Sequence, residues 1–199
     1  MSAPKLSILI CTIDSRKDQF SKLVEVLNPQ CELGVVELLF AGGLPFSEGG
    51  PTRGAKRQAL LEGSKGDFIV FRDDDDPCPT DYVEIILPHC IDGVDCIGHR
   101  FDCYGYAPMG KLERAIVSNR YKAWKTNAHD LPKYERFTHH LVPVRREHAI
   151  KAGFNPLLDE GEDYAYSMRL LKQGHLKNEA FIDKVLYTIQ HNRNKKAGT

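Results

Sequence analysis

Apolar and polar residues alternate along the first half of the chain in segments typical of an α/β protein. Three runs rich in Leu, Ile, Val and Phe predict strands that are covered on both faces. Between them lie two segments whose apolar residues share one helical stripe. We expect strands at 5–12, 34–40 and 67–71 and helices at 15–27 and 53–63. This strand–helix–strand order indicates a parallel sheet with right-handed crossovers.

Two local signals mark the limits of these helices. Pro29 follows the first helical segment and is expected to stop it, because the residue before a proline disfavours the helical conformation. Thr52 is expected to cap the second helix, since its side-chain oxygen can accept a hydrogen bond from an N–H of the first turn.

The second half of the chain has a less regular pattern. The polar and aromatic segment 111–133 gives no clear prediction. Around it we expect strands within 93–105, 139–144 and 184–191, helices at 146–153 and 161–174, the latter ended by Gly174, and a mobile tail at 192–199.

Composition and charge indicate an ordinary globular protein. The 199 residues fit one domain, and Lys+Arg and Asp+Glu are equal at 27 each, so net charge points to neither a nucleic-acid nor a membrane partner. The six cysteines show no zinc-binding spacing, and no apolar run approaches the roughly 20 residues that cross a bilayer. Without a signal-peptide pattern, we expect a cytoplasmic protein with free thiols.

Four consecutive aspartates, Asp73 to Asp76, follow the third predicted strand. Two charges about 4 Å apart repel by roughly 4 kcal/mol at an effective dielectric near 20. Helix capping would account for one or two of them, and a solvated acidic turn is another ordinary interpretation. Alternatively, carboxylates two positions apart clamp a divalent cation that holds a phosphorylated substrate. Ligands collect at the carboxyl ends of parallel strands, which favours such a site here, and the spacing fits neither an EF-hand nor a P-loop.

Glu162 and Asp163 open the helix predicted at 161–174. Acidic residues are common in a first turn because the helix dipole favours them, so a purely structural role is one interpretation. The other is that one carboxylate faces a cleft as a general base, within hydrogen-bond reach of the proton that it removes.

The motifs around the third strand and the last helix occur in a recognisable order. They are Arg57-Gln58, Ser64, Gly66-Asp67 and Asp73–Asp76, followed by Arg145-Arg146, Gly153-Phe154, Glu162-Asp163, Arg169-Leu170 and Gly174. In this order they resemble the family 2-like glycosyltransferases of the GT-A fold. The resemblance covers most of the chain, with a poorly matched middle at about 104–136.

The resemblance implies a single Rossmann-like GT-A domain over 1–199, with a central, mostly parallel sheet flanked by helices. Residues 1–103 would form the nucleotide-sugar-binding half and 104–191 the acceptor-side half. The implied activity is metal-dependent transfer of a sugar from a nucleotide-diphosphate sugar, a UDP-sugar by default, to an acceptor hydroxyl with inversion.

The same resemblance implies roles for individual residues. Asp73 would approach the ribose or phosphate of the donor, and Asp75 would bind Mn²⁺ or Mg²⁺ across the diphosphate. Asp163 would be the general base, with Glu162 in support. Further implied contacts are Thr12, Lys56, Arg57, Asp74 and His140 to the donor and His191 to the metal.

Several of these candidates keep a structural alternative. His191 at a strand end could be a surface residue, and His140 could line the acceptor or diphosphate side or lie on a solvated strand end. Tyr121 and Trp124 could stack on a sugar or belong to the core. Segment 38–46 lacks the carboxylate with which the family usually reads the base, so the base stays open.

Two other functions compete with glycosyl transfer. A two-metal nucleotidyltransferase also uses Asp-x-Asp at a strand end, but it would need a third carboxylate on the same metals and usually has a Gly-rich loop where this chain has CTIDSR. A non-catalytic nucleotide-sugar-binding protein is the other alternative, against which the two intact acidic motifs argue. Polysaccharide, lipid-linked sugar, protein and modified nucleic acid all remain possible acceptors.

Overall fold

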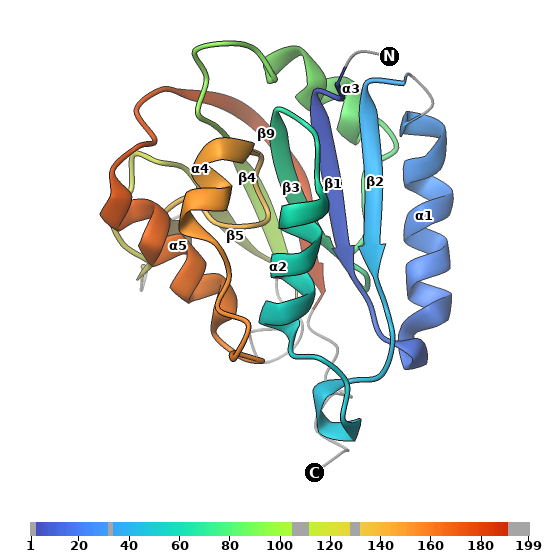
Figure 1. The fold of residues 1–199 in the computed structure, drawn as a ribbon. Helices are drawn as coiled ribbons and strands as arrows, with labels where there is room; N and C mark the ends of the chain where they lie inside the picture. The colour runs from blue at the N-terminus through green and yellow to red at the C-terminus, as the bar shows by residue number, and fades with distance from the viewer. Residues whose placement is uncertain (1–2, 32–33, 105–111, 128–131, 191–199) are drawn as a thin grey trace.

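The computed structural model describes residues 3–31, 34–104, 112–127 and 132–190. Within these ranges one nine-stranded sheet carries helices on both faces (Figure 1). Its strands are β1 Leu6–Cys11, β2 Val36–Ala41, β3 Phe68–Asp73, β4 Cys96–Tyr104, β5 Leu112–Val117, β6 Lys125–Thr126, β7 Tyr134–Arg136, β8 Val144–Arg145 and β9 Glu179–Gln190. The helices are α1 Lys17–Cys31, α2 Arg53–Gly63, α3 Tyr82–Ile86, α4 Arg146–Ala152 and α5 Glu162–Gln173.

The sheet runs in the order β2-β1-β3-β8-β4-β5-β7-β6, and β9 pairs with β4. Pairing is parallel along β2-β1-β3, between β4 and β9 and between β5 and β7, so most of the paired residues in the described strands are parallel. The short β8 enters antiparallel between β3 and β4. The predicted α/β class, with a central and mostly parallel sheet flanked by helices, is confirmed.

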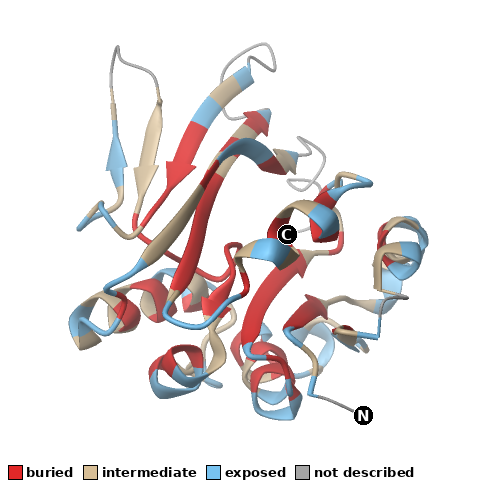
Figure 2. Cartoon of the chain, turned by 90° about the horizontal axis from the view of Figure 1, so that it is seen from above, coloured by how far each residue is buried: buried red, intermediate tan, exposed pale blue. Residues whose placement is uncertain are grey.

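Alternating residues of the central strands divide the core into two layers. Leu6, Ile8 and Ile10 of β1 pack with α1 and α3, whereas Leu9 packs on the opposite face with α2, α4 and α5. Figure 2 shows the strands as the most buried part of the molecule, with the outer faces of the helices exposed. Burial on both faces explains why these strands are continuous apolar runs in the sequence.

The first helix is longer than predicted, because Pro29 lies inside α1 and the helix ends at Cys31. A proline removes its own N–H from the helix ladder and its ring crowds the carbonyl four residues before it, but the last turn has other support. The side-chain amide of Gln30 donates to the carbonyl oxygens of Val26 at 2.8 Å and Pro79 at 3.1 Å and accepts from the N–H of Val83 at 2.9 Å. Contacts with the segment after β3 therefore override the local stop signal.

The predicted strand at 139–144 is wrong for most of its length, since only Val144 belongs to β8. Residues 139–143 form a buried turn. The His140 carbonyl accepts from Phe71 N–H at 2.9 Å, and the Pro143 carbonyl accepts from Ile97 N–H at 2.9 Å. The segment thus bonds to β3 and β4 without regular strand pairing, and Pro143 cannot donate to either.

The other elements agree with the sequence pattern. The Thr52 side chain caps α2, and Gly174 ends α5 in the left-handed conformation with φ 64°. The last strand begins earlier than predicted, at Glu179. Segment 111–133 contributes β5 and β6, while His191 and the tail 192–199 lie outside the described residues. No helix in the described ranges is long and apolar enough to span a membrane.

Candidate active site

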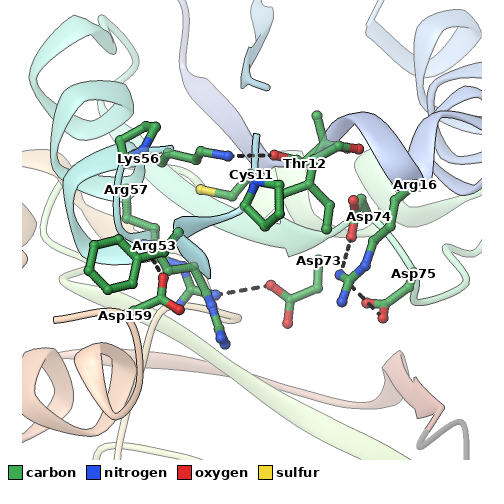
Figure 3. A pocket seen from close by; sticks show the side chains of 14 residues that line it. Cys11, Thr12, Arg16, Arg53, Lys56, Arg57, Asp73, Asp74, Asp75 and Asp159 are labelled. Carbon is green, nitrogen blue, oxygen red and sulfur yellow. Dashed lines mark hydrogen bonds and ion pairs between the residues drawn. The ribbon is translucent and has the colours of Figure 1, made fainter. Parts of the chain in front are cut away.

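The carboxyl ends of β1 and β3 lie side by side, with Cys11 paired with Asp73 in register. The segments that follow these strands enclose a cavity of about 330 Å³, here called the donor cavity (Figure 3). Its charged and hydroxyl-bearing lining residues are Thr12, Arg16, Arg53, Lys56, Arg57, Asp73, Asp74, Asp75 and Asp159. The strand-end rule thus brings most of the predicted donor-binding residues into one cavity.

The amino-terminal end of α2 is held beside this cavity by the loop at 155–159. Thr52 Oγ1 accepts from Ala55 N–H at 3.0 Å and donates to the Pro156 carbonyl at 2.6 Å. A Cβ on Gly54 would lie 2.1 Å from the Asn155 carbonyl oxygen, so only glycine allows this close approach. The helix therefore presents Lys56 and Arg57 to the cavity from a fixed position.

Arg57 is a buried cation that connects two carboxylates from distant parts of the chain. Its Nη2 lies 3.0 Å from Asp73 Oδ1 and its Nη1 lies 3.0 Å from Glu162 Oε1. Burial opposes the charge on Arg57, but Asp73 and then Glu162 stabilise it and its pKa is raised above the ordinary value. Glu162 is itself buried, which raises its pKa, and its partner Arg57 acts in the opposite direction. Glu162, at the start of α5, therefore helps to position Arg57.

The four consecutive aspartates have different surroundings. Arg16, just after β1, lies 2.8 Å from Asp74 and 3.3 Å from Asp75 (Figure 3). Burial raises the pKa of Asp74, against the hydrogen bond from Arg16. Asp76 is instead buried against β9, where it accepts from Tyr187 Oη at 2.9 Å and from Gln190 N–H at 2.8 Å. Three of the aspartates face the cavity and the fourth fastens the strand end to β9.

Lys56 joins the loops that surround the donor cavity. Its Nζ donates to the carbonyl oxygens of Thr12 at 3.0 Å and Leu44 at 3.3 Å. Asp159 accepts from the backbone N–H of Arg53 at 2.8 Å. The cavity thus has four cationic and four anionic side chains in its lining, whose formal charges cancel.

Asp163 lies in a second cavity of about 220 Å³, here called the second cavity. Its other lining residues are Cys103, Ala115, Val117, Trp124, Tyr134, Arg136, His139, His140, Leu141 and Ile189. His140, predicted at the donor, lines this cavity together with Asp163 and is buried, so it does not lie on a solvated strand end. Trp124 also lines this cavity. Tyr121 lies against Arg120 instead, with the Arg120 Cζ atom 4.9 Å from the centroid of the Tyr121 ring.

The Arg57 ion pairs link the linings of the two cavities. Asp73, one partner of Arg57, lines the donor cavity, and Glu162, the other, precedes the Asp163 of the second cavity. Arg57 therefore connects a carboxylate of the donor cavity to the helix turn that carries Asp163.

The residues at the donor cavity fit a hard divalent cation. No group of three His, Cys, Asp or Glu side chains in the described ranges is arranged to hold a metal, and His191 lies outside them. Asp73 and Asp75 nevertheless offer carboxylate oxygens to the cavity, and Asp74 Oδ2 is buried with no hydrogen-bond partner among the described residues. Oxygen donors completed by water and phosphate suit Mg²⁺ or Mn²⁺.

Sequence reasoning missed three charged residues of the donor cavity: Arg16, Arg53 and Asp159. Arg16 follows β1 by five residues, so the strand-end rule that found Asp73 could have found it. Asp159 gave no such signal, because the loop that carries it reaches α2 only through tertiary contacts.

Comparison with solved structures supports the fold. No family model and no curated protein matches the chain. The chain is similar to Staphylococcus aureus TarS 1–349, with TM-score 0.61 and 14% identity over 94% of this chain and 60% of that one. It also resembles TarS 1–349 in complex with UDP-GlcNAc, with TM-score 0.58 and 12% identity over 98% of this chain and 61% of that one.

A third similar structure is the catalytic domain of Drosophila β1,4-galactosyltransferase 7 in complex with xylobiose. Its TM-score is 0.58, with 14% identity over 96% of this chain and 73% of that domain. The neighbours are GT-A glycosyltransferase domains, so the predicted GT-A fold is confirmed. The chain spans about three fifths of the length of the TarS fragment.

Proposed function

We propose that this chain transfers a sugar from a nucleotide-diphosphate sugar to an acceptor hydroxyl. One observation carries the proposal: Arg57 joins Asp73 in the donor cavity to Glu162, the neighbour of Asp163 in the second cavity. A donor and an acceptor bound in these cavities would meet beside a carboxylate suited to remove a proton. The TarS neighbours solved with UDP and with UDP-GlcNAc support a uridine nucleotide as the donor.

The donor diphosphate is expected among the cationic side chains of the donor cavity. Arg53, Lys56 and Arg16 lie on its walls and can bind phosphate oxygens. A Mn²⁺ or Mg²⁺ ion held by Asp73 and Asp75 would add positive charge at the departing diphosphate. Arg57 is buried between its two carboxylates, so its contribution is to hold Asp73 in place.

Asp163 is the proposed general base. Its Oδ1 accepts from the Tyr164 N–H at 2.7 Å, which fixes the carboxylate in the first turn of α5. It would take the proton of the acceptor hydroxyl while that oxygen bonds to the anomeric carbon. The bond from that carbon to the diphosphate oxygen breaks with its electron pair on the leaving nucleoside diphosphate. A single displacement of this kind inverts the configuration of the anomeric carbon.

Donor cleavage tests the proposal. The purified protein would be incubated with UDP-, GDP-, CMP- and dTDP-sugars, with Mn²⁺ or with a chelator, and nucleotide release followed by mass spectrometry. We expect metal-dependent release from a UDP-sugar, with loss of at least about 100-fold in Asp75→Ala, since a metal ligand is removed.

Asp92→Ala is the matched control, because Asp92 is a fully exposed aspartate outside both cavities and should leave release unchanged. Asp163→Asn should retain donor binding while it lowers transfer to an acceptor. If no sugar nucleotide is bound or cleaved with any metal, the transferase proposal fails and a non-catalytic or nucleotidyltransferase role takes its place.

A further inference from the structure

The second cavity is small and has mainly apolar and aromatic walls. Trp124, Tyr134 and Leu141 form much of its lining, and its volume of about 220 Å³ lies below the roughly 300–1,000 Å³ of pockets for drug-sized ligands. It therefore suits a single ring. Asp163 and Arg136 are the acidic and basic residues of the lining, and their formal charges cancel, so the cavity does not favour a charged ligand.

His140 lines this cavity, and both nitrogens of its ring are buried without a hydrogen-bond partner among the described residues. The side chain is 96% buried, with a relative exposure of 4%. Burial and the positive charge of Arg57 lower its pKa well below the ordinary value, so the ring is neutral. A neutral imidazole has one N–H donor and one acceptor nitrogen. A buried polar group of this kind is normally satisfied, so a ligand hydroxyl or an ordered water that reaches the ring would complete its hydrogen bonding.

Trp124 forms a fixed aromatic wall. Its Nε1 donates to Ser167 Oγ at 3.2 Å, and its ring meets Tyr164 edge-on, with the centroids 5.2 Å apart. His139 makes a second edge contact at 5.6 Å. An indole held in this way is preorganised to pack against the C–H face of a ring and loses little freedom when it does so.

We propose that the second cavity binds the neutral terminal sugar ring of a carbohydrate acceptor, with His140 hydrogen-bonded to a hydroxyl and Trp124 packed against the C–H face. This inference rests on the proposed function, because it takes Asp163 as the base for that ring's reacting hydroxyl. A sugar ring offers hydroxyls that can hydrogen-bond to His140. It also has an apolar face that matches the apolar walls of the cavity. A lipid chain would satisfy only the walls and would leave His140 unpaired.

Intrinsic fluorescence gives a direct test, because Trp124 is the only tryptophan among the 199 residues. Methyl glycosides of glucose, galactose, mannose, xylose and N-acetylglucosamine would be titrated into the protein, with hexanol and benzyl alcohol as apolar probes. We expect a saturable change with at least one glycoside. His140→Phe should weaken that binding by about tenfold, since a ligand hydrogen bond is lost.

The His140→Phe variant keeps a ring against Phe71 and removes two unpartnered polar atoms, so we expect it to fold with an unchanged or higher thermal midpoint. The matched control is His175→Ala, because this histidine is exposed and does not line the cavity; it should bind glycosides as the unmodified chain does. Unchanged glycoside binding in folded His140→Phe would overturn the inference. Saturable binding of the apolar probes alone would also overturn the inference. The absence of saturable binding by any probe would do the same.

Nucleotide release measured on the same samples separates the two proposals. Release from a UDP-sugar without glycoside binding would support the proposed function and overturn the carbohydrate acceptor. His140-dependent glycoside binding without nucleotide release would support the carbohydrate site and contradict the proposed transferase activity.

Discussion

At the scale of single residues, the site depends on a guanidinium that is buried between carboxylates. Arg57 comes from the second turn of α2, Asp73 from the end of β3 and Glu162 from the start of α5. A buried charge without a partner is costly, so each of the three elements constrains where the other two can lie. Arg57, which links the linings of the two cavities, is therefore also a residue on which stability depends.

Replacing Arg57 tests this coupling. We expect Arg57→Met to lower the free energy of unfolding by about 3 kcal/mol, because Glu162 is left buried without its cation. The double variant Arg57→Met/Glu162→Gln should recover part of that loss, since the uncompensated charge is gone. Urea denaturation gives both values. Arg53→Met, on the exposed face of the same helix, should stay within about 0.5 kcal/mol; an equal loss in this control would contradict the ion-pair explanation.

Roles were predicted from the sequence for Asp73, Asp74 and Asp75 but not for Asp76. Asp73 and Asp75 were predicted at the cavity because a strand end and carboxylate spacing are local properties. The role of Asp76 depends on Tyr187 and Gln190, which are more than a hundred residues away in sequence. Nothing near Asp76 in the chain indicates that it fastens β3 to β9.

At the scale of elements, local signals failed where tertiary hydrogen bonds replaced the expected backbone pattern. Pro29 was expected to end α1, but side-chain contacts of Gln30 with the segment after β3 extend the helix. Residues 139–143 were expected to form a strand, but their carbonyl groups bond to β3 and β4 from a turn. The strands at the centre were predicted well, because two-sided burial leaves a continuous apolar run that needs no partner to be recognised.

Gln30 is expected to be the residue that keeps the last turn of α1 past Pro29. Gln30→Ala removes three hydrogen bonds, to Val26, Pro79 and Val83, and should lower the free energy of unfolding by about 2 kcal/mol. Chemical denaturation measures this change. Gln19→Ala, on the exposed surface of the same helix, should have almost no effect, and similar losses in the two variants would mean that these bonds do not support the turn.

At the scale of the whole molecule, buried carboxyl groups and buried histidines change stability in opposite directions as pH changes. Burial raises the pKa of Asp76 to about 7, above the roughly 3.9 of an unfolded aspartate. Its contribution is therefore fully present below pH 4 and is lost as pH rises through 7. Burial lowers the pKa of His99 to about 4 and of His139 to about 3, and lowers that of His140 well below 6.5. Stability from these histidines is present above pH 6.5 and is lost on acidification.

Between pH 6.5 and 4.5 the three histidines oppose Asp76 and, through smaller shifts, Asp74 and Glu162, whose pKa values burial also raises, so we expect the protein to lose stability as pH falls. Each group contributes at most about 1.4 kcal/mol per pH unit, which gives a net slope of up to about 3 kcal/mol per unit. Asp76→Asn keeps an acceptor for Gln190 N–H and removes the opposing titration of Asp76, so its slope should steepen to at most about 4 kcal/mol per unit. Urea denaturation across this range measures both slopes, with Asp92→Asn as the exposed control. An unchanged or shallower slope in Asp76→Asn would mean that Asp76 is ionised in the folded protein throughout this range, because Tyr187 and Gln190 offset the destabilising effect of burial on the carboxylate.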